Sequence, residues 1–320
     1  VISELLFNNF INHFHGIFIG NITYALRLLT FLPLSNTPKL CKYFLTFSAS
    51  FTGTFIPLLI DSTIMLTFIG LGLHDAEDLT LRGLKEARSC DLLFLEEYTS
   101  ILSGAEKGDI EKVVRQSVRL LKREDIENRE AIILEPAQKK KVGLLIPGDP
   151  LISTTHVSLL LSAKELGIRT KIVHNASIIS AATSKSGMQN YKFGMSASIP
   201  FPFGFVPETP YNVLKQNLGL GLHTLLFLDI ENNEKKKCMT VNQAIEYLLN
   251  IEKKRKENVF THNTLCIALC NIGSDKEIIR ADKAKKLLKL NFGSAPHCLI
   301  VPGKLHFMEK EYLKEFAELK

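Results

Sequence analysis

The pattern of hydrophobic and polar positions becomes regular at residue 65. From there, short apolar runs end in glycine, proline or polar residues and alternate with segments of helical periodicity. The runs predict four buried strands, at Leu66–Ile69, Leu92–Leu95, Val142–Ile146 and Lys171–Val173. The segments around them predict helices at Asp78–Ser89, Asp109–Lys122, Asn128–Lys139 and Thr155–Leu166. Because strands and helices alternate, we expect a parallel, doubly wound α/β sheet.

The second half of the chain shows a different order of elements. It predicts strands at Ser196–Phe201, Thr224–Asp229, Leu265–Cys270 and Cys298–Val301. Helices are expected at Thr209–Asn217, Thr240–Lys253, Ala281–Leu288 and Met308–Glu318. Thr240 and Gln243 form a capping box at the start of the clearest helix. We therefore expect an N-terminal α/β domain over residues 65–173 and a C-terminal α/β domain over residues 174–320.

Residues 1–64 lack this regularity. They hold five charged residues and nine phenylalanines, without a clear period of 2 or 3.6. Their most apolar stretch, Ile17–Leu34, is interrupted by Asn21 and Arg27, so it falls short of an uninterrupted membrane span. We expect an atypical hydrophobic extension that is not native or is disordered. A membrane anchor and an additional folding element are the alternatives.

Composition narrows the class of protein. With 46% hydrophobic and 22% charged residues among 320, the chain is globular and not broadly disordered. Its net charge of +6 is too diffuse to predict a nucleic-acid partner. The six cysteines form no C-x-x-C pair, which favours reduced thiols in a cytoplasmic protein, and no residue set has metal-ligand spacing. Cys266 and Cys270 would share one face of a strand, where packing in the core is the simpler interpretation.

Small or polar residues follow three of the four strands predicted in the first half. They are Gly70-Leu71-Gly72-Leu73, Pro147-Gly148-Asp149-Pro150 and His174-Asn175-Ala176-Ser177-Ile178. Ligands of open α/β sheets bind beyond the carboxyl ends of the strands, so these loops predict one shared cleft. There, the Asp149 carboxylate would accept hydrogen bonds from ribose hydroxyls or balance a cation.

Each of these signals also has a plain structural explanation. The glycines serve a tight turn equally well, and Asp75 stands where a dinucleotide fingerprint needs its third glycine. Asp149 is a common turn residue, and Ser177 is suited to cap a helix. His223 and His297 stand at strand edges, where a single histidine usually has a structural role.

Eight separated blocks of sequence carry a resemblance to a known family. They are Phe68-Ile69-Gly70-Leu71-Gly72-Leu73, Glu97-Tyr98-Thr99-Ser100, Arg123-Glu124-Asp125, Pro147-Gly148-Asp149-Pro150-Leu151, Thr154-Thr155-His156, Tyr191-Lys192-Phe193-Gly194, Gly221-Leu222-His223-Thr224-Leu225-Leu226-Phe227-Leu228-Asp229-Ile230 and Val301-Pro302-Gly303-Lys304-Leu305-His306. Together, and in this order, they closely resemble the diphthine synthases, the diphthamide-pathway methyltransferases of archaea and eukaryotes. The resemblance runs from Met65 to the C-terminus.

The resemblance implies both a fold and a reaction. The fold is that of the tetrapyrrole methylases (class III methyltransferases): two α/β domains with the cofactor cleft between them, usually in a homodimer. The cofactor is S-adenosylmethionine, and the substrate is translation elongation factor 2 bearing an aminocarboxypropyl-histidine. Archaeal members methylate the amino group of that arm to give diphthine. The family's cofactor contacts fall here on Leu73, Asp149, Ile152, Ser177, Ile178, Leu228, Ile272 and His297.

The chain departs from the family pattern at two places. Ala182-Thr183-Ser184-Lys185-Ser186 replaces a stretch that usually contains glycine, and Asn271 stands where an arginine is common. Residues 1–64 have no counterpart in the family.

Methyl transfer from a sulfonium needs positioning more than acid or base catalysis, which agrees with a sequence that offers no obvious catalytic pair. Water or a histidine would take the proton of the amine. Two other functions stay open: a methylase of the same fold that acts on a tetrapyrrole or ribosomal RNA, and a membrane-anchored binding protein without catalysis.

Overall fold

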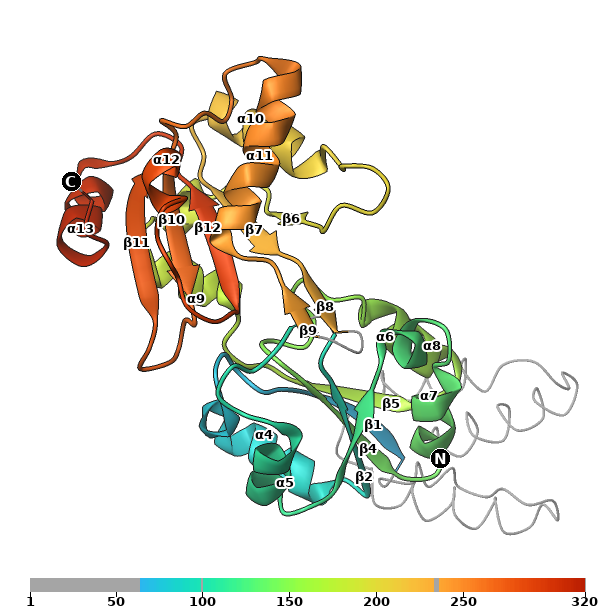
Figure 1. Ribbon diagram of the computed structural model, residues 1–320. Coiled ribbons are helices and arrows are strands. Elements are labelled where there is room, and N and C mark those ends of the chain that lie inside the picture. Colours follow the sequence, from blue (N-terminus) through green and yellow to red (C-terminus); the bar gives the residue numbers. More distant parts are fainter. Residues whose placement is uncertain (1–63, 99, 233–235, 320) are drawn as a thin grey trace, which may run out of the picture. The chain divides into compact units, whose positions relative to one another are not determined.

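Two five-stranded sheets with helices packed on them dominate the part of the chain that the computed structural model describes, residues 64–98, 100–232 and 236–319 (Figure 1). All strands of the first sheet lie before residue 174, and all strands of the second lie after residue 196. The predicted domain boundary after residue 173 stays a prediction, and this distribution of strands supports it. The predictions for residues 1–63 lie outside the described residues.

The first sheet is entirely parallel. It consists of β1 (Met65–Gly70), β2 (Leu92–Glu96), β3 (Val118–Leu121), β4 (Lys141–Ile146) and β5 (Arg169–Val173). Their order across the sheet is β3-β2-β4-β1-β5, which is the doubly wound arrangement that the sequence predicts. The central strands are buried on both faces, and this explains why they appear in the sequence as uninterrupted apolar runs.

Helices cover both faces of this sheet. They are a short 3-10 helix, η2 (Ala76–Asp78), and the α-helices α4 (Leu81–Ser89), α5 (Lys107–Val114), α6 (Arg123–Glu127), α7 (Ala131–Ala137) and α8 (Val157–Glu165). Alternate residues of β1 point to opposite faces. Leu66 and Phe68 join the core beneath α6, α7 and α8, whereas Ile69 joins the core beneath α4 and α5.

The second sheet is mixed. It contains β6 (Ala197–Ile199), β7 (Thr224–Leu228), β10 (Leu265–Cys270), β11 (Ile278–Lys283) and β12 (His297–Val301), in the order β11-β10-β12-β7-β6. Only the β6–β7 pair is parallel. A separate hairpin, β8 (Ile230–Asn232) with β9 (Lys236–Cys238), follows β7 directly.

The helices of the second half also pack on both faces of their sheet. They are α9 (Ile178–Lys185), η3 (Asn190–Lys192), α10 (Thr209–Gly219), α11 (Val241–Arg255), α12 (Ala284–Leu287) and α13 (Phe307–Phe316). One face packs against α10, α11 and α12, and the other packs against α9 and α13. The capping box of α11 is confirmed: the Thr240 hydroxyl accepts from the Gln243 N–H, and the Gln243 side chain accepts from the Thr240 N–H.

Three helix predictions are wrong in part. Residues 109–122 are not one helix, because α5 ends at Val114 with Arg115 in the left-handed region (φ 59°), and β3 follows. Residues 128–139 hold the shorter α7, preceded by the separate α6. Residues 281–288 begin in β11, and the helix itself is the single turn of α12.

Two further predictions concern single residues. The helix predicted to start at Asp78 starts at Leu81 instead, and Thr80 caps it, because the Thr80 hydroxyl accepts a hydrogen bond from the Gly83 N–H at 3.0 Å. Cys266 and Cys270 are confirmed as residues of one core, and burial raises the pKa of both thiols above its usual range.

No helix among the described residues is both long and apolar enough to cross a membrane.

Candidate active site

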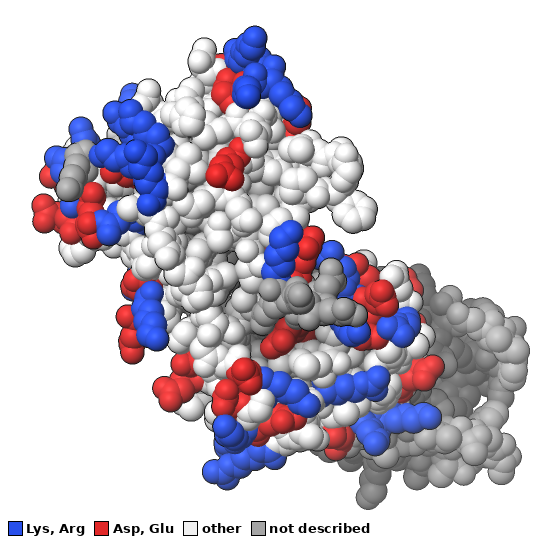
Figure 2. Space-filling model, viewed as in Figure 1, with Lys and Arg blue, Asp and Glu red and all other residues white. Residues whose placement is uncertain are grey.

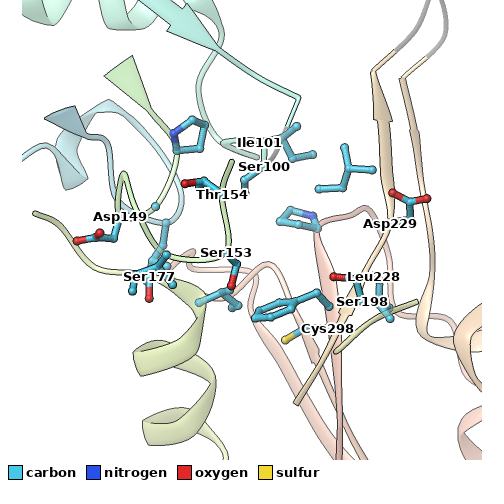
Figure 3. A pocket seen from close by; sticks show the side chains of 18 of the residues that line it. Ser100, Ile101, Asp149, Ser153, Thr154, Ser177, Ser198, Leu228, Asp229 and Cys298 are labelled. Atoms are coloured by element: carbon cyan, nitrogen blue, oxygen red, sulfur yellow. The ribbon is translucent and has the colours of Figure 1, made fainter. Parts of the chain in front are cut away.

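A cavity of about 330 Å³ lies where the loops after the first sheet's strands meet the ends of strands of the second sheet. All eight residues proposed for the cofactor line it: Leu73, Asp149, Ile152, Ser177, Ile178, Leu228, Ile272 and His297. In Figure 3, Asp149 and Ser177 lie on one side of the pocket, and Leu228, Asp229 and Cys298 lie on the other. The predicted shared cleft is therefore present, and its volume is in the usual range of small-molecule sites.

The glycine turn after β1 is built against the backbone of the next loop. Gly72 (φ +89°) and Gly148 (φ +77°) form an isolated antiparallel bridge, in which the Gly148 N–H donates to the Gly72 carbonyl at 2.7 Å. A Cβ on Gly72 would lie 2.4 Å from the Cβ of Asp78. The Asp78 carboxylate accepts from the backbone N–H of Leu73 and His74, at 2.9 and 2.7 Å. The glycines thus serve a close backbone approach, which in turn presents Leu73 to the cavity.

Asp149 is almost fully buried, and its carboxylate is already in use. It accepts hydrogen bonds from His174 Nδ1 at 2.8 Å, from the Asn175 N–H at 3.3 Å and from the Leu151 N–H at 3.2 Å. The carboxylate therefore joins the loop after β4 to the loop after β5. Its position at the cavity is as predicted, but the sequence did not indicate these protein partners.

Asn175 is a positioning residue that the sequence analysis did not single out by itself. Its side-chain amide donates to the carbonyls of Gly70 and Asp78, at 2.9 and 3.0 Å. A Cβ on Gly70 would lie 2.6 Å from the Gly148 carbonyl oxygen and 2.8 Å from the Cβ of Asn175. The loops after β1, β4 and β5 are consequently held together by one set of contacts. The only hint in the sequence was an asparagine within a polar loop after a strand.

Ser177 stands at the N-cap of α9, but its side chain makes no capping hydrogen bond. The hydroxyl is therefore not used to start the helix, and it lines the cavity beside Ile178. The unusual segment 182–186 continues α9 in regular geometry as far as Lys185. A glycine follows at Gly187 (φ +68°), where a Cβ would collide with the Tyr312 ring.

The second-sheet side of the cavity is mostly apolar and buried. Leu228 and Ile272 are 7% and 5% exposed. Both ring nitrogens of His297 are engaged, Nε2 with the Ser294 carbonyl at 3.0 Å and Nδ1 with the Val241 N–H at 3.4 Å. Burial lowers the pKa of His297, so the ring is neutral near pH 7. Among the described residues, no group of three or more His, Cys, Asp or Glu is arranged to hold a metal ion.

Asn271, one of the two departures noted in the sequence, has a structural role. It adopts a positive φ of 51°, which asparagine tolerates better than most residues. Its side-chain amide donates to the Ser294 carbonyl at 2.6 Å, and its own N–H donates to the Pro296 carbonyl at 2.9 Å. Asn271 thereby orders the loop that carries His297, and it brings no charge to the site.

Arg123 and Tyr98 also line the cavity, although sequence reasoning gave them no role. The Arg123 guanidinium stacks on the Tyr98 ring, with 5.3 Å from Cζ to the centroid. The Tyr98 hydroxyl is hydrogen-bonded to Thr155 Oγ1 at 3.1 Å, and burial raises the pKa of Tyr98 to about 12. Both residues belong to the sequence blocks that carry the resemblance described above, and that was the signal available for finding them.

Three of the other blocks meet away from the cavity, at the carboxylate of Glu309 on α13. This buried group accepts from Lys192 Nζ at 2.5 Å, His223 Nε2 at 3.1 Å and the backbone N–H groups of Gln189 and His306. The prediction that His223 is structural is confirmed, because the ring is fully buried and its Nδ1 accepts from the Gly303 N–H. We call Lys192, His223 and Glu309 the Glu309 cluster.

Comparison with known proteins agrees with this architecture. A sequence model of the family Tetrapyrrole (Corrin/Porphyrin) Methylases matches residues 65–288. The chain therefore belongs to the tetrapyrrole methylase family.

Within that family, the chain belongs with the diphthine synthases. It is 46% identical to the diphthine synthase of Methanosarcina acetivorans and 47% identical to that of Methanosarcina barkeri, in each case over 79% of this chain and 96% of the relative. A crystal structure of diphthine synthase superposes with a TM-score of 0.73 at 36% identity, covering 80% of this chain and 97% of that one.

Proposed function

We propose that this chain, a diphthamide-biosynthesis methyltransferase, uses S-adenosylmethionine to methylate the amino group of the aminocarboxypropyl-histidine of elongation factor 2, giving diphthine. The observation that carries the proposal is the convergence of the eight predicted cofactor residues on one cavity. They come from loops, strand ends and the start of a helix that are far apart in the sequence, and the fold brings them together.

The residues present fit this cofactor. Leu73, Ile178, Leu228 and Ile272 offer apolar walls of the kind that pack against an adenine ring, and the Ser177 hydroxyl is not used by its own helix. Asp149 holds two of the cavity's loops in register through its three hydrogen bonds. When bound, S-adenosylmethionine would supply an electrophilic methyl group on a sulfonium.

The reaction asks this chain mainly for positioning. The nitrogen–methyl bond would form from the lone pair of the amine as the sulfur–methyl bond breaks and leaves a neutral thioether. The proton of the amine would pass to water or to a histidine. Leu228 and Ile272 form buried apolar walls, and the hydrogen-bonded loops fix the shape of the cavity in advance.

Mass spectrometry of the factor after incubation tests the proposal. The full chain would be incubated with labelled S-adenosylmethionine and elongation factor 2, either with the aminocarboxypropyl arm or unmodified. Label is expected only on the factor with the arm, because the unmodified imidazole lacks the amine. Equal labelling of both forms, or labelling of a tetrapyrrole added as competitor, would refute it.

Two finer points belong to the same proposal. The resemblance implies a homodimer, and light scattering of the full chain would show a mass of twice 35.9 kDa. We also propose that the protein acts in the cytoplasm, where a translation factor would meet it. Cell fractionation with an antibody to the chain is the corresponding measurement.

A further inference from the structure

One positive group at the cavity has no role in the function proposed above. Among the described residues that line the cavity, the only Asp, Glu, Lys or Arg residues are Asp149, Asp229 and Arg123. Asp149 is bound to His174 and loop backbone, and Asp229 accepts from the Phe201 N–H at 2.8 Å. Arg123 is thus the only Lys or Arg among them.

The start of α6 fixes the backbone that carries Arg123. The Asp125 carboxylate accepts from the Lys122 N–H at 2.9 Å and pairs with Arg129 at 2.9 Å. An acidic residue in the first turn also complements the helix dipole. The block Arg123-Glu124-Asp125 therefore contains one residue that fixes the turn and another that lines the cavity.

The Arg123 side chain is held from two directions. Its guanidinium lies over Tyr98, and its Nε lies 3.6 Å from Glu127 Oε1. Thr155 links these two supports, because its hydroxyl contacts both the Tyr98 hydroxyl at 3.1 Å and Glu127 Oε1 at 3.4 Å. Held in this way, the guanidinium loses less freedom on binding an anion than an unsupported arginine would.

The free edge of the guanidinium is suited to a carboxylate that arrives from solvent. The side chain is 64% exposed, and its terminal nitrogens have no hydrogen-bond partner among the described residues. A planar guanidinium with two such nitrogens binds a carboxylate through paired hydrogen bonds. The rest of the surface does not indicate where an anionic ligand binds, since acidic and basic side chains lie near one another on the face shown in Figure 2.

We propose that Arg123 binds the carboxylate of the aminocarboxypropyl arm and selects an arm in which that carboxylate is free. The inference rests on the proposed function, in which the amine to be methylated and this carboxylate share one carbon atom. Holding the carboxylate therefore positions the amine. A nearby positive charge also lowers the pKa of that amine, which favours the unprotonated form that attacks the methyl group.

The methionine part of S-adenosylmethionine carries the same amino-acid chemistry, so the test must separate the two ligands. Arg123 stands outside the eight residues proposed for the cofactor, and its exposure places it where a protein-borne arm would enter. For each variant, the Kd for S-adenosylmethionine and the KM for the modified elongation factor are measured in separate experiments.

The experiment compares Arg123→Gln and Arg123→Lys with the wild-type full chain. Arg119→Gln is the matched control, because Arg119 is also exposed and stacks on an aromatic ring (Phe94, 5.9 Å) but does not line the cavity. Steady-state kinetics with the modified factor give kcat and KM, and calorimetry gives the Kd for S-adenosylmethionine. A semisynthetic factor whose arm ends in a carboxamide is the second substrate.

We expect Arg123→Gln to raise KM for the modified factor by about 10- to 100-fold, as the loss of a charge-assisted pair does, with little change in the Kd of the cofactor. Arg123→Lys should fall between this variant and wild type, and Arg119→Gln should match wild type. The wild-type enzyme should discriminate against the carboxamide arm, and Arg123→Gln should not.

Three results would overturn the inference. An unchanged KM in a folded Arg123→Gln variant would show that Arg123 does not bind the arm. A weakened Kd for S-adenosylmethionine with unchanged KM would assign Arg123 to the cofactor instead. Failure of the wild-type enzyme to methylate the modified factor would refute the proposed function itself, and this inference with it.

Discussion

Glu309→Gln should destabilise the protein by about 3 kcal/mol without touching the cavity. Burial by itself raises the pKa of the Glu309 carboxyl, but hydrogen bonds from Lys192, Gln189, His306 and His223 outweigh it and lower the pKa to about 2. The ordinary pKa is 4.5, so folding lowers the pKa by about 2.5. At roughly 1.4 kcal/mol for each pKa unit, the charged carboxylate stabilises the fold by about 3 kcal/mol. Glutamine keeps the shape of the side chain but removes this charge and leaves Lys192 without its counter-ion.

Thermal and urea unfolding followed by circular dichroism measure the loss. For a domain of this size, about 3 kcal/mol corresponds to a fall in Tm of about 6–12 °C at pH 7. Glu311→Gln is the control, since Glu311 lies on the same helix but is exposed and pairs with Lys314 at the surface. In a cycle with Lys192→Met, the double variant should lose less than the sum of the single losses.

The pH dependence gives a second check on the Glu309 cluster. A carboxyl whose pKa is lowered by folding contributes its full stability above its unfolded value, here about 4.5, and loses that contribution as the pH falls towards about 2. The difference between wild type and Glu309→Gln should therefore be constant from pH 6 to pH 8 and narrow below about pH 4.5. A Tm within 1 °C of wild type at pH 7, or a difference as large at pH 3 as at pH 7, would refute the reasoning.

Three other substitutions test the site and its supports. Asp149→Ala should weaken S-adenosylmethionine binding by about 10- to 100-fold, because charge-assisted hydrogen bonds contribute about 1.5–3 kcal/mol each; unchanged affinity by calorimetry in a folded variant would remove Asp149 from the site. Asn175→Ala loses the hydrogen bonds to the carbonyls of Gly70 and Asp78, so it should weaken binding of S-adenosylmethionine by about 3- to 10-fold and lower the Tm. An unchanged affinity together with an unchanged Tm would show that the loops hold together without Asn175. Thr240→Ala should cost about 1 kcal/mol in unfolding experiments and leave kcat unchanged, and a loss of activity at full stability would contradict a purely structural cap.

The strands that stand out most clearly in the sequence lie in the interior of the two sheets. β1, β4 and β10 are buried on both faces, so their residues are almost all apolar and the runs stand out. Four strands escaped prediction: the short hairpin strands β8 and β9, and the edge strands β3 and β11. The other two edge strands, β5 and β6, overlap the predicted strands Lys171–Val173 and Ser196–Phe201. An edge strand has a neighbour on one side only and carries exposed residues such as Arg119 and Asp282, which made the segments of β3 and β11 resemble amphipathic helix.

The cavity residues in the loops after the first sheet were predictable from strand order, whereas Leu228, Ile272 and His297 were expected only from the resemblance to the family. Loops that follow parallel strands must meet at one edge of the sheet, so polar residues in those loops indicate a site before any contact is known. The partners of these residues were not predictable. Asn175 binds a carbonyl 105 positions earlier in the chain, and Glu309 binds Lys192 from 117 positions away. No local period records such distances, and only the folded chain brings these groups together.

The way in which the cavity's polar groups are used has a consequence for the proposed reaction. The Asp149 carboxylate is engaged by backbone N–H groups and by His174, and the Asp229 carboxylate accepts from the Phe201 N–H. His297 is neutral with both nitrogens bonded. Methyl transfer disperses the positive charge of a sulfonium, so an unpaired anion beside the methyl group would stabilise the ground state more than the transition state. Carboxylates that are already satisfied by the protein keep the loops in place without that penalty. The same hydrogen bonds therefore serve both folding and catalysis, because they fix the walls and leave the interior of the cavity without a strong opposing charge.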